Sequence, residues 1–200
     1  MSVQQAKIDY IVKVAVDLFL QKGIDAVTIK DVSTVAGVGE ATIYRYFSTK
    51  QNLVLRAAGR MADDLHATYF NLEGATTGLG KLVAFYQNFL RIYREHPAYY
   101  RFIFEFDAMQ QVAGELDEYE STLLPYMQSY LDAYALGRSD GTVKEMADVR
   151  LFYLATTHAL MGLCKKLTMD RVVLKQDARG EEEIQMLIDV FIDRVTDLCV

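Results

Sequence analysis

The sequence has little of what interrupts helices or cross-links chains. Its 200 residues include two prolines and twelve glycines, so few positions force a helix to end. The two cysteines, Cys164 and Cys199, are too few for a disulfide framework in a chain of this length and too far apart for a paired-cysteine metal or redox site. We therefore expect a reducing, cytoplasmic setting, and the spacing assigns neither thiol a redox role.

Long hydrophobic runs are also missing. The longest uncharged run, 151–164, has fourteen residues, whereas a membrane span needs roughly 20 apolar residues. Lys7, Asp9 and Lys13 interrupt the N-terminal segment, which therefore lacks the form of a secretory signal. With 52% apolar and 24% charged residues, the chain is expected to fold as an all-α protein with a sizeable core and no membrane contact.

The net charge of −6 is unevenly distributed. Residues 1–60 carry eight Lys or Arg against five Asp or Glu, whereas the other 140 carry thirteen against twenty-two. A DNA duplex repels a uniformly negative surface, but a basic N-terminal part joined to an acidic remainder is compatible with a DNA-binding end. Ordinary scatter of surface charges is the alternative interpretation of so small an excess.

Hydrophobic periodicity predicts about nine helices and no strand. The first places Ile8 to Phe19 on one face and stops near Gly23. The capping pair Thr28 and Asp31 opens a second helix that ends at Gly37, and a third spans 40–47. The others are expected from a cap at Ser48 and Gln51 to about 70, through 82–92, and over about 97–110, 116–136 with a kink at Pro125, 144–169 and 181–199.

Residues 28–47 have the layout of a helix-turn-helix, in which the second helix can lie in the major groove. The outward residues of that second helix are Glu40, Ala41, Thr42, Tyr44, Arg45 and Tyr46. Thr42 can hydrogen-bond a base or contact a thymine methyl, and Tyr44 and Tyr46 suit phosphate. Lys50 adds charge in the first turn of the next helix, where backbone amides also favour an anion.

These residues closely resemble the DNA-binding head of the TetR family of bacterial repressors. The resemblance rests on Thr28-Ile29, Val32, Ala36-Gly37-Val38, Thr42-Ile43-Tyr44, Tyr46-Phe47, Lys50 and Leu53. It covers about residues 5–55 by motif and the rest loosely by its helical layout. It implies a DNA-binding domain over 1–48, a ligand-binding and dimerisation domain over 49–200, and a homodimer that reads a palindrome with Thr28, Thr42, Tyr44, Tyr46 and Lys50.

Two residues depart from the family's pattern. Gly39 stands where the family usually has a capping serine, and glycine is a weaker cap. Glu40 occupies a position that is more often polar or basic. It would repel phosphate there unless it accepts a hydrogen bond from a cytosine amine.

Aromatic residues are concentrated between Phe85 and Phe106, where 22 residues include nine aromatics. Rings at this density either fill a core or line a cavity. TetR-like bodies hold an inducer between helices that correspond here to residues 50–165, so the resemblance implies a cavity, and the rings favour a hydrophobic effector. The candidate ligand-binding residues are Phe89, Tyr93, Phe102, Glu105, Phe106, Met109, Tyr126, Tyr130 and His158. Glu105 could favour a cation, and His158 is more simply a hydrogen-bonded core histidine.

The last two long helices have wider apolar faces than one side of a bundle needs, and the resemblance implies that part of them forms a four-helix dimer interface. The run 151–164 is expected to be covered on all sides. Enzyme motifs are missing: Gly78-Leu79-Gly80-Lys81 lacks the spacing of a phosphate loop, and there is no Glu-x-x-His pair, zinc helix or nucleophile elbow. We expect a ligand-responsive transcriptional regulator, a repressor that a hydrophobic small molecule releases from a palindromic operator, without cofactor, metal or catalysis. The alternative is a helical small-molecule-binding or interaction module that does not bind DNA.

Overall fold

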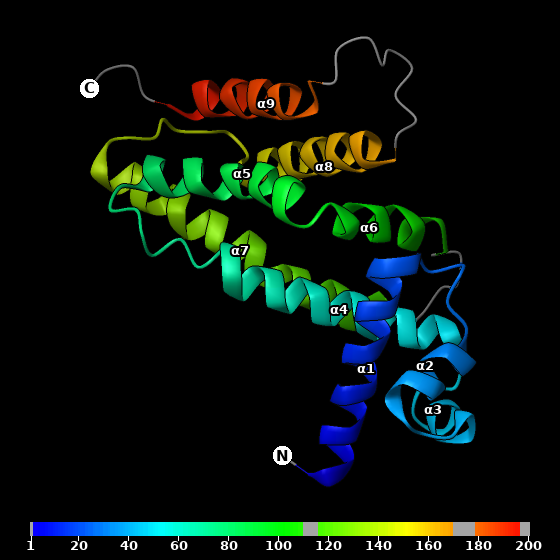
Figure 1. Ribbon diagram of the computed structural model, residues 1–200. Coiled ribbons are helices and arrows are strands. Elements are labelled where there is room, and N and C mark those ends of the chain that lie inside the picture. Colours follow the sequence, from blue (N-terminus) through cyan, green and yellow to red (C-terminus); the bar gives the residue numbers. More distant parts are fainter. Residues whose placement is uncertain (1, 110–115, 170–178, 197–200) are drawn as a thin grey trace. The chain divides into compact units, whose positions relative to one another are not determined.

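The structure, a computed structural model, describes residues 2–109, 116–169 and 179–196. Nine helices account for most of these residues, and an isolated antiparallel bridge between Val143 and Thr196 is their one β pairing. The expected all-α class is confirmed (Figure 1). The chain divides into unit 1, comprising Met1–Asp64 and Arg101–Leu123, and unit 2, comprising Leu65–Tyr100 and Leu124–Val200. No helix in the described ranges is long and apolar enough to cross a membrane.

The first two helices have the ends that their sequence predicts. Helix α1 (Val3–Lys22) stops at Gly23, whose φ of 87° suits glycine. Helix α2 (Ile29–Ala36) opens on a complete capping box. In this box the Thr28 amide donates to Asp31 Oδ2 at 2.8 Å and the Asp31 amide donates to Thr28 Oγ1 at 3.2 Å. These short-range bonds set where α2 begins.

A tight turn joins α2 to helix α3 (Glu40–Phe47). Gly37 ends α2 in the left-handed conformation at φ 65°, as the sequence predicts. Ser33 Oγ donates to the Val38 carbonyl at 2.6 Å, and the Val38 amide donates back to the Ser33 carbonyl at 3.1 Å. Gly39 offers no side-chain cap, so this serine is what closes the turn.

The inward faces of the first helices share one apolar core. Its fully buried side chains come from α1, the α1–α2 loop, α2, α3 and the start of the next helix, and include Ile11, Phe19, Ile24, Val27, Val32, Ile43 and Leu53. Burial of this apolar surface contributes about 25 cal/mol per Å². It stabilises α2 and α3, which have only eight residues each and would be marginal alone.

Helix α4 (Lys50–Tyr69) begins one residue away from its expected cap. Thr49 Oγ1 accepts from the Asn52 amide at 3.1 Å, whereas Ser48 ends α3 at φ 61°. The predicted cap at Ser48 is therefore wrong. Ser48 is needed to reverse the chain after α3, so Thr49 takes the capping role.

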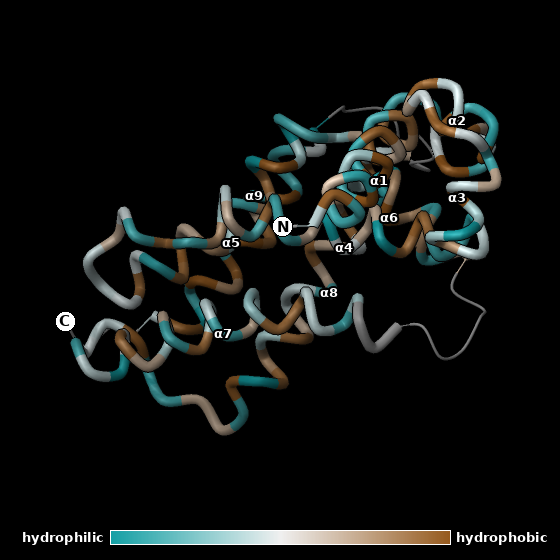
Figure 2. Tube along the Cα trace, turned by 90° about the horizontal axis from the view of Figure 1, so that it is seen from below, coloured by the Kyte–Doolittle hydropathy of each residue, from teal (hydrophilic) through white to brown (hydrophobic). Residues whose placement is uncertain are grey.

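The remaining helices are α5 (Gly78–Glu95), α6 (Pro97–Met109), α7 (Leu116–Asp140), α8 (Val149–Thr168) and α9 (Gly180–Val195). Within unit 2, α5, α8 and α9 run side by side (Figure 1). Figure 2 shows hydrophilic and hydrophobic residues alternating along these helices, as expected of helices that bury one face. Helix α7 runs four residues beyond its expected end, and α8 begins five residues later than expected.

The N-terminus of α5 depends on a close approach of two glycines. A Cβ atom at Gly78 would lie 1.9 Å from the Gly137 amide nitrogen, so no larger residue fits there. The side chains of Asp140 and Thr142 accept from the Gly78 and Leu79 amides at 2.7 and 3.1 Å. These bonds satisfy the free amides of the first turn, and they occupy the backbone of the Gly78-Leu79-Gly80-Lys81 segment that superficially resembles a phosphate loop.

Helix α8 is not covered on all sides in the single chain, so that expectation is wrong. Leu151 and Leu154 are 62% and 42% exposed, and His158, between them and the C-terminal end of the helix, is exposed as well. On α9, Met186 and Val190 are 70% and 57% exposed. Each of these two helices therefore presents an apolar stripe with no neighbour in the described chain.

Candidate nucleic-acid interface and effector site

The outer face of α3 is exposed and chemically mixed. Ile43 and Phe47 hold the helix against the core with 0% and 4% exposure. The opposite face presents Glu40, Ala41, Tyr44 and Arg45 as exposed side chains, with Thr42 and Tyr46 half-buried beside them. Tyr44 is 49% exposed. A short helix that is anchored on one face and carries hydroxyl, guanidinium and carboxylate groups on the other has the makeup of a base-reading element.

Arg45 and Tyr46 form a pair at the end of this face. The Arg45 guanidinium carbon lies 5.0 Å from the centre of the Tyr46 ring, and Nη2 donates to Tyr46 Oη at 3.2 Å. The Tyr46 ring itself packs edge-on against buried Phe47, with the ring centres 6.4 Å apart. The guanidinium is thus held by a ring that the core orients.

Two further groups frame α3. Thr28, the cap of α2, is exposed, and Lys50 is half-buried as the first residue of α4. The first-turn amides of both helices lack intrahelical acceptors and add partial positive charge at these positions. Such helix starts bind phosphate oxygens in many proteins.

A sequence model of the bacterial regulatory proteins of the tetR family matches residues 11–57, which include α2, the turn, α3 and the start of α4. The N-terminal part of the chain therefore belongs to the TetR family. The HTH-type transcriptional repressor KstR2 of Mycolicibacterium smegmatis is 25% identical over 147 residues, covering 72% of this chain and 71% of the repressor. The HTH-type transcriptional regulator AlkX of Mycobacterium tuberculosis is 39% identical over 56 residues, 26% of each chain.

Solved structures agree on the fold. The reduced form of NemR from E. coli superposes with a TM-score of 0.74 at 14% identity, covering 98% of this chain and all of NemR. The structure of the ketosteroid transcriptional regulator KstR2 of Mycobacterium tuberculosis superposes with a TM-score of 0.63 at 17% identity, covering 95% of each chain. These likenesses concern the fold. The tetR-family match over residues 11–57 and the KstR2 relative identify a DNA-binding transcriptional regulator of the ligand-responsive kind, as the sequence predicts.

Helix α6 is bound to the end of α1 within unit 1. Glu105 Oε2 accepts from the Ile24 amide at 2.5 Å, and Arg101 Nη2 donates to the Leu20 carbonyl. A Cβ atom at Gly23 would lie 3.0 Å from Glu105 Oε1, so the carboxylate is pressed against the corner between α1 and α2. Glu105 is the candidate partner for a cationic ligand, but in the structure its carboxylate binds a backbone amide.

The candidate ligand residues on α6 pack into unit 1. Phe102 and Phe106 are 1% and 4% exposed and stack with their ring centres 6.0 Å apart. Phe102 also contacts Phe19 of α1 at 6.1 Å, and Phe106 contacts Tyr119 of α7 at 5.0 Å. Met109 is half-buried. The rings of Phe102 and Phe106 therefore belong to the core that carries the helix-turn-helix.

The other candidates lie in unit 2, which contains a polar group inside an aromatic core. Tyr86 Oη donates to Tyr130 Oη at 3.0 Å and shares a 2.8 Å hydrogen bond with Thr156 Oγ1. Tyr86 and Tyr130 are 0% exposed, and Tyr153 packs on Tyr130 at 5.3 Å. Burial raises the pKa of Tyr153 to about 12 and also raises the pKa values of Tyr86 and Tyr130, so the three phenols are neutral at physiological pH.

The rest of the unit 2 candidates surround this core at different depths. Phe89 is 6% exposed, and Tyr93 and Tyr126 are half-buried. Tyr126 packs on Phe70 with the ring centres 4.8 Å apart. His158 is exposed on α8, so the expectation of a core histidine is wrong; its helix position faces away from the unit 2 core.

The described cysteine is enclosed. Cys164 is 0% exposed, and burial raises the pKa of its thiol to about 12. A protonated, covered thiol is a poor nucleophile. Cys199 lies outside the described residues.

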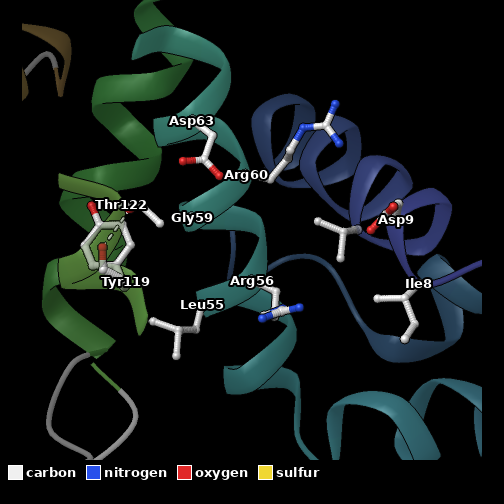
Figure 3. A pocket seen from close by; sticks show the side chains of 10 residues that line it. Ile8, Asp9, Leu55, Arg56, Gly59, Arg60, Asp63, Tyr119 and Thr122 are labelled. Atoms are coloured by element: carbon white, nitrogen blue, oxygen red, sulfur yellow. Dashed lines mark hydrogen bonds between the residues drawn. The ribbon is translucent and has the colours of Figure 1, made fainter. Parts of the chain in front are cut away.

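A hollow of about 200 Å³ lies in unit 1 over α4, between α1 and the start of α7 (Figure 3). Arg56 and Arg60 lie on the side of α4 toward α1, and Asp63 lies on the side toward Tyr119 and Thr122. Asp9 of α1 completes the charged lining. Two arginines and two aspartates balance, so the charge of this hollow favours neither a cation nor an anion.

Proposed function

We propose that this chain is a homodimeric repressor that a hydrophobic small molecule releases from a palindromic operator. The observation that carries the proposal is the exposed polar face of α3, anchored by Ile43 and Phe47 and preceded by a capped α2. Functionally, we divide the chain after residue 48: the first three helices read DNA, and residues 49–200 bind ligand and form the dimer.

In this proposal, small side chains let α3 approach the bases. Ala41 and Thr42 contact base edges in the major groove, where a threonine can hydrogen-bond or touch a thymine methyl. Tyr44 and Tyr46 contact backbone phosphates, as do Thr28 and Lys50 from the helix starts on either side. These contacts to phosphate set the orientation of α3, and the contacts to bases select the sequence.

Charge on α3 adds a second level of selection. Arg45 suits guanine, whose O6 and N7 match the fork of a guanidinium, and Tyr46 is a positioning residue because it holds that guanidinium. Glu40 repels phosphate and accepts from a cytosine amine. We therefore expect a G·C pair in each half-site.

The dimer interface is proposed on α8 and α9. The exposed apolar side chains Leu151, Leu154, Met186 and Val190 come from these two helices and have no covering residue in the described chain. Pairing of the two helices with their copies in a second protomer would bury both stripes. A dimer sets two copies of α3 about one helical turn of duplex apart or somewhat more.

Effector binding is proposed at the aromatic residues. KstR2, one of the similar repressors, is a ketosteroid transcriptional regulator, which supports an apolar ligand class. Rings such as Phe89, Tyr126 and Tyr130 can surround an apolar body, and the buried hydroxyls of Tyr86 and Thr156 can bind a polar group. The ligand acts by shifting the population between DNA-competent and incompetent states. Helix α4 carries the change, because it runs unbroken from Lys50 to the beginning of unit 2.

The alternative is a helical binding module that does not bind DNA. A gel-shift experiment with the DNA upstream of the chain's own coding region separates the two. The proposal predicts a salt-sensitive, sequence-selective complex that Thr42→Ala or Tyr44→Ala weakens about tenfold or more. The exposed Gln21→Ala variant at the end of α1 should bind as wild type. Absence of a selective complex would favour the alternative.

Neither proposal includes catalysis or a cofactor. Groups of three or more potential metal ligands do not occur among the described residues. We place the protein in the cytoplasm, because its proposed target is bacterial chromosomal DNA.

A further inference from the structure

Unit 2 contains a cleft of about 490 Å³ whose lining is separate from the buried Tyr86, Tyr130 and Tyr153 of the aromatic core. Its walls come from the last turns of α4, the α4–α5 loop, the first turn of α5 and the middle of α7. Clefts of 300–1,000 Å³ hold small-molecule ligands in other proteins. The size is therefore sufficient for a ligand, and the side chains of the lining indicate its chemistry.

The cationic group of the cleft is Lys81 of α5. This side chain is half-buried, and its ammonium group has no hydrogen-bond or ion-pair partner within the described ranges. A lysine ammonium that has no protein partner at the side of a cleft is available to the oxygens of an anion.

Further hydrogen-bonding groups lie in the same cleft. His66 Nε2 and Ser129 Oγ are 3.1 Å apart and link α4 to α7, and the His66 ring packs edge-on against Tyr126 at 4.9 Å. The Asn71 amide has no partner in the described chain. Lys81, Asn71 and the His66–Ser129 pair can therefore supply donors to the oxygens of one anionic group.

The opposing charge limits that anion to a single negative charge. Asp132 also lines the cleft, and its Oδ1 accepts from Gln128 Nε2 at 2.7 Å. Lys81 supplies one positive charge, which a carboxylate matches, whereas the second negative charge of a dianion such as a phosphate monoester would meet the carboxylate of Asp132. The rest of the lining is apolar: Ala67, Leu72, Ala133 and Leu136.

We propose that this cleft binds an amphipathic carboxylic acid, with its carboxylate at Lys81 and its apolar chain along Ala67 and Leu136. Charge-assisted hydrogen bonds to an ammonium are stronger than neutral ones, so the acid is preferred over its alcohol. Binding itself does not involve DNA. A regulatory effect of this acid rests on the proposed function, because it requires α4 to connect the ligand to the DNA-binding helices.

The test uses the purified full-length chain and three eight-carbon probes, octanoate, 1-octanol and octylamine, with affinities measured by calorimetry. Octanoate should bind wild type more tightly than the alcohol or the amine. Lys81→Met should raise the octanoate Kd about tenfold or more, whereas Lys13→Met, a matched change on exposed α1, should leave it unchanged. Ala67→Leu, which fills the cleft from an exposed helix position, should also abolish binding while the helical circular dichroism stays intact.

Several results would overturn the cleft proposal: no octanoate binding, equal binding of the alcohol or amine, or unchanged affinity in Lys81→Met. DNA binding is measured on the same preparations without octanoate. If wild type binds its operator but not octanoate, the cleft proposal fails and the proposed function stands. If it binds octanoate but no DNA, the proposed function fails instead.

Discussion

Replacement of Glu105 tests whether α6 holds the DNA-reading helices in place. The Glu105 carboxylate accepts from the Ile24 amide at 2.5 Å, and Ile24 is 0% exposed. In Glu105→Ala, this amide stays buried without an acceptor. An unsatisfied buried donor costs about 1–3 kcal/mol, and hydrogen bonds to charged groups are at the upper end of that range. We therefore expect a loss of about 2–3 kcal/mol in the free energy of unfolding.

The assay is urea unfolding followed by far-UV circular dichroism at fixed protein concentration, because dimers gain stability with concentration. With a slope of about 2 kcal/mol/M, the midpoint should fall by about 1 M or somewhat more. Glu105→Gln keeps an acceptor oxygen and should lose less. Glu120→Ala, an exposed change on α7, serves as the matched control. The reasoning would be refuted if Glu105→Ala and Glu120→Ala unfolded at the same urea concentration.

Three further predictions follow from the local structure. Gly59→Ala should stabilise the chain by about 0.5–1 kcal/mol in the same assay, because the added Cβ meets Thr122 Cγ2 at 3.5 Å, an ordinary contact inside a helix; destabilisation would contradict the described packing. Cys164 should resist thiol reagents in the folded chain and react once urea unfolds it, since burial raises its pKa to about 12; fast labelling of native protein would contradict its burial. Thr28→Ala should cost about 1 kcal/mol at neutral pH. Hydrogen bonds from Thr28 lower the pKa of Asp31 below its usual 3.8, so the capping contribution is present above pH 3.8 and is lost as the pH falls through the lowered pKa; a cost for Thr28→Ala that is the same at pH 2 and pH 7 would argue against the capping box.

The helix-turn-helix could be predicted because its signals are local. Thr28 and Asp31 are three residues apart, Gly37 requires only its own φ, and Ile43 and Phe47 lie one turn apart on one face. Each of these features depends on a few neighbouring residues. The resemblance to the TetR family rests on the same short segment.

Contacts between distant residues could not be predicted. The start of α5 at Gly78 depends on Gly137, and the role of Glu105 depends on Ile24, 81 positions earlier in the chain. Their spacing in the sequence groups the aromatic candidates together. The structure divides them between two units, because α6 packs with α1. The exposed stripe of α8 could not be predicted either, because the sequence does not show whether the neighbours of an apolar helix come from its own chain.

The central claim is that α3 reads a DNA sequence, and it is tested most directly by selecting bound duplexes from a random library with the purified chain. Its affinity for the enriched duplex is then compared with that for a scrambled duplex of equal composition. The account predicts a palindrome with a G·C pair in each half-site, bound about a thousandfold more tightly than the scrambled duplex, with an affinity that falls as salt rises. No enrichment, or equal affinity for both duplexes, would contradict it.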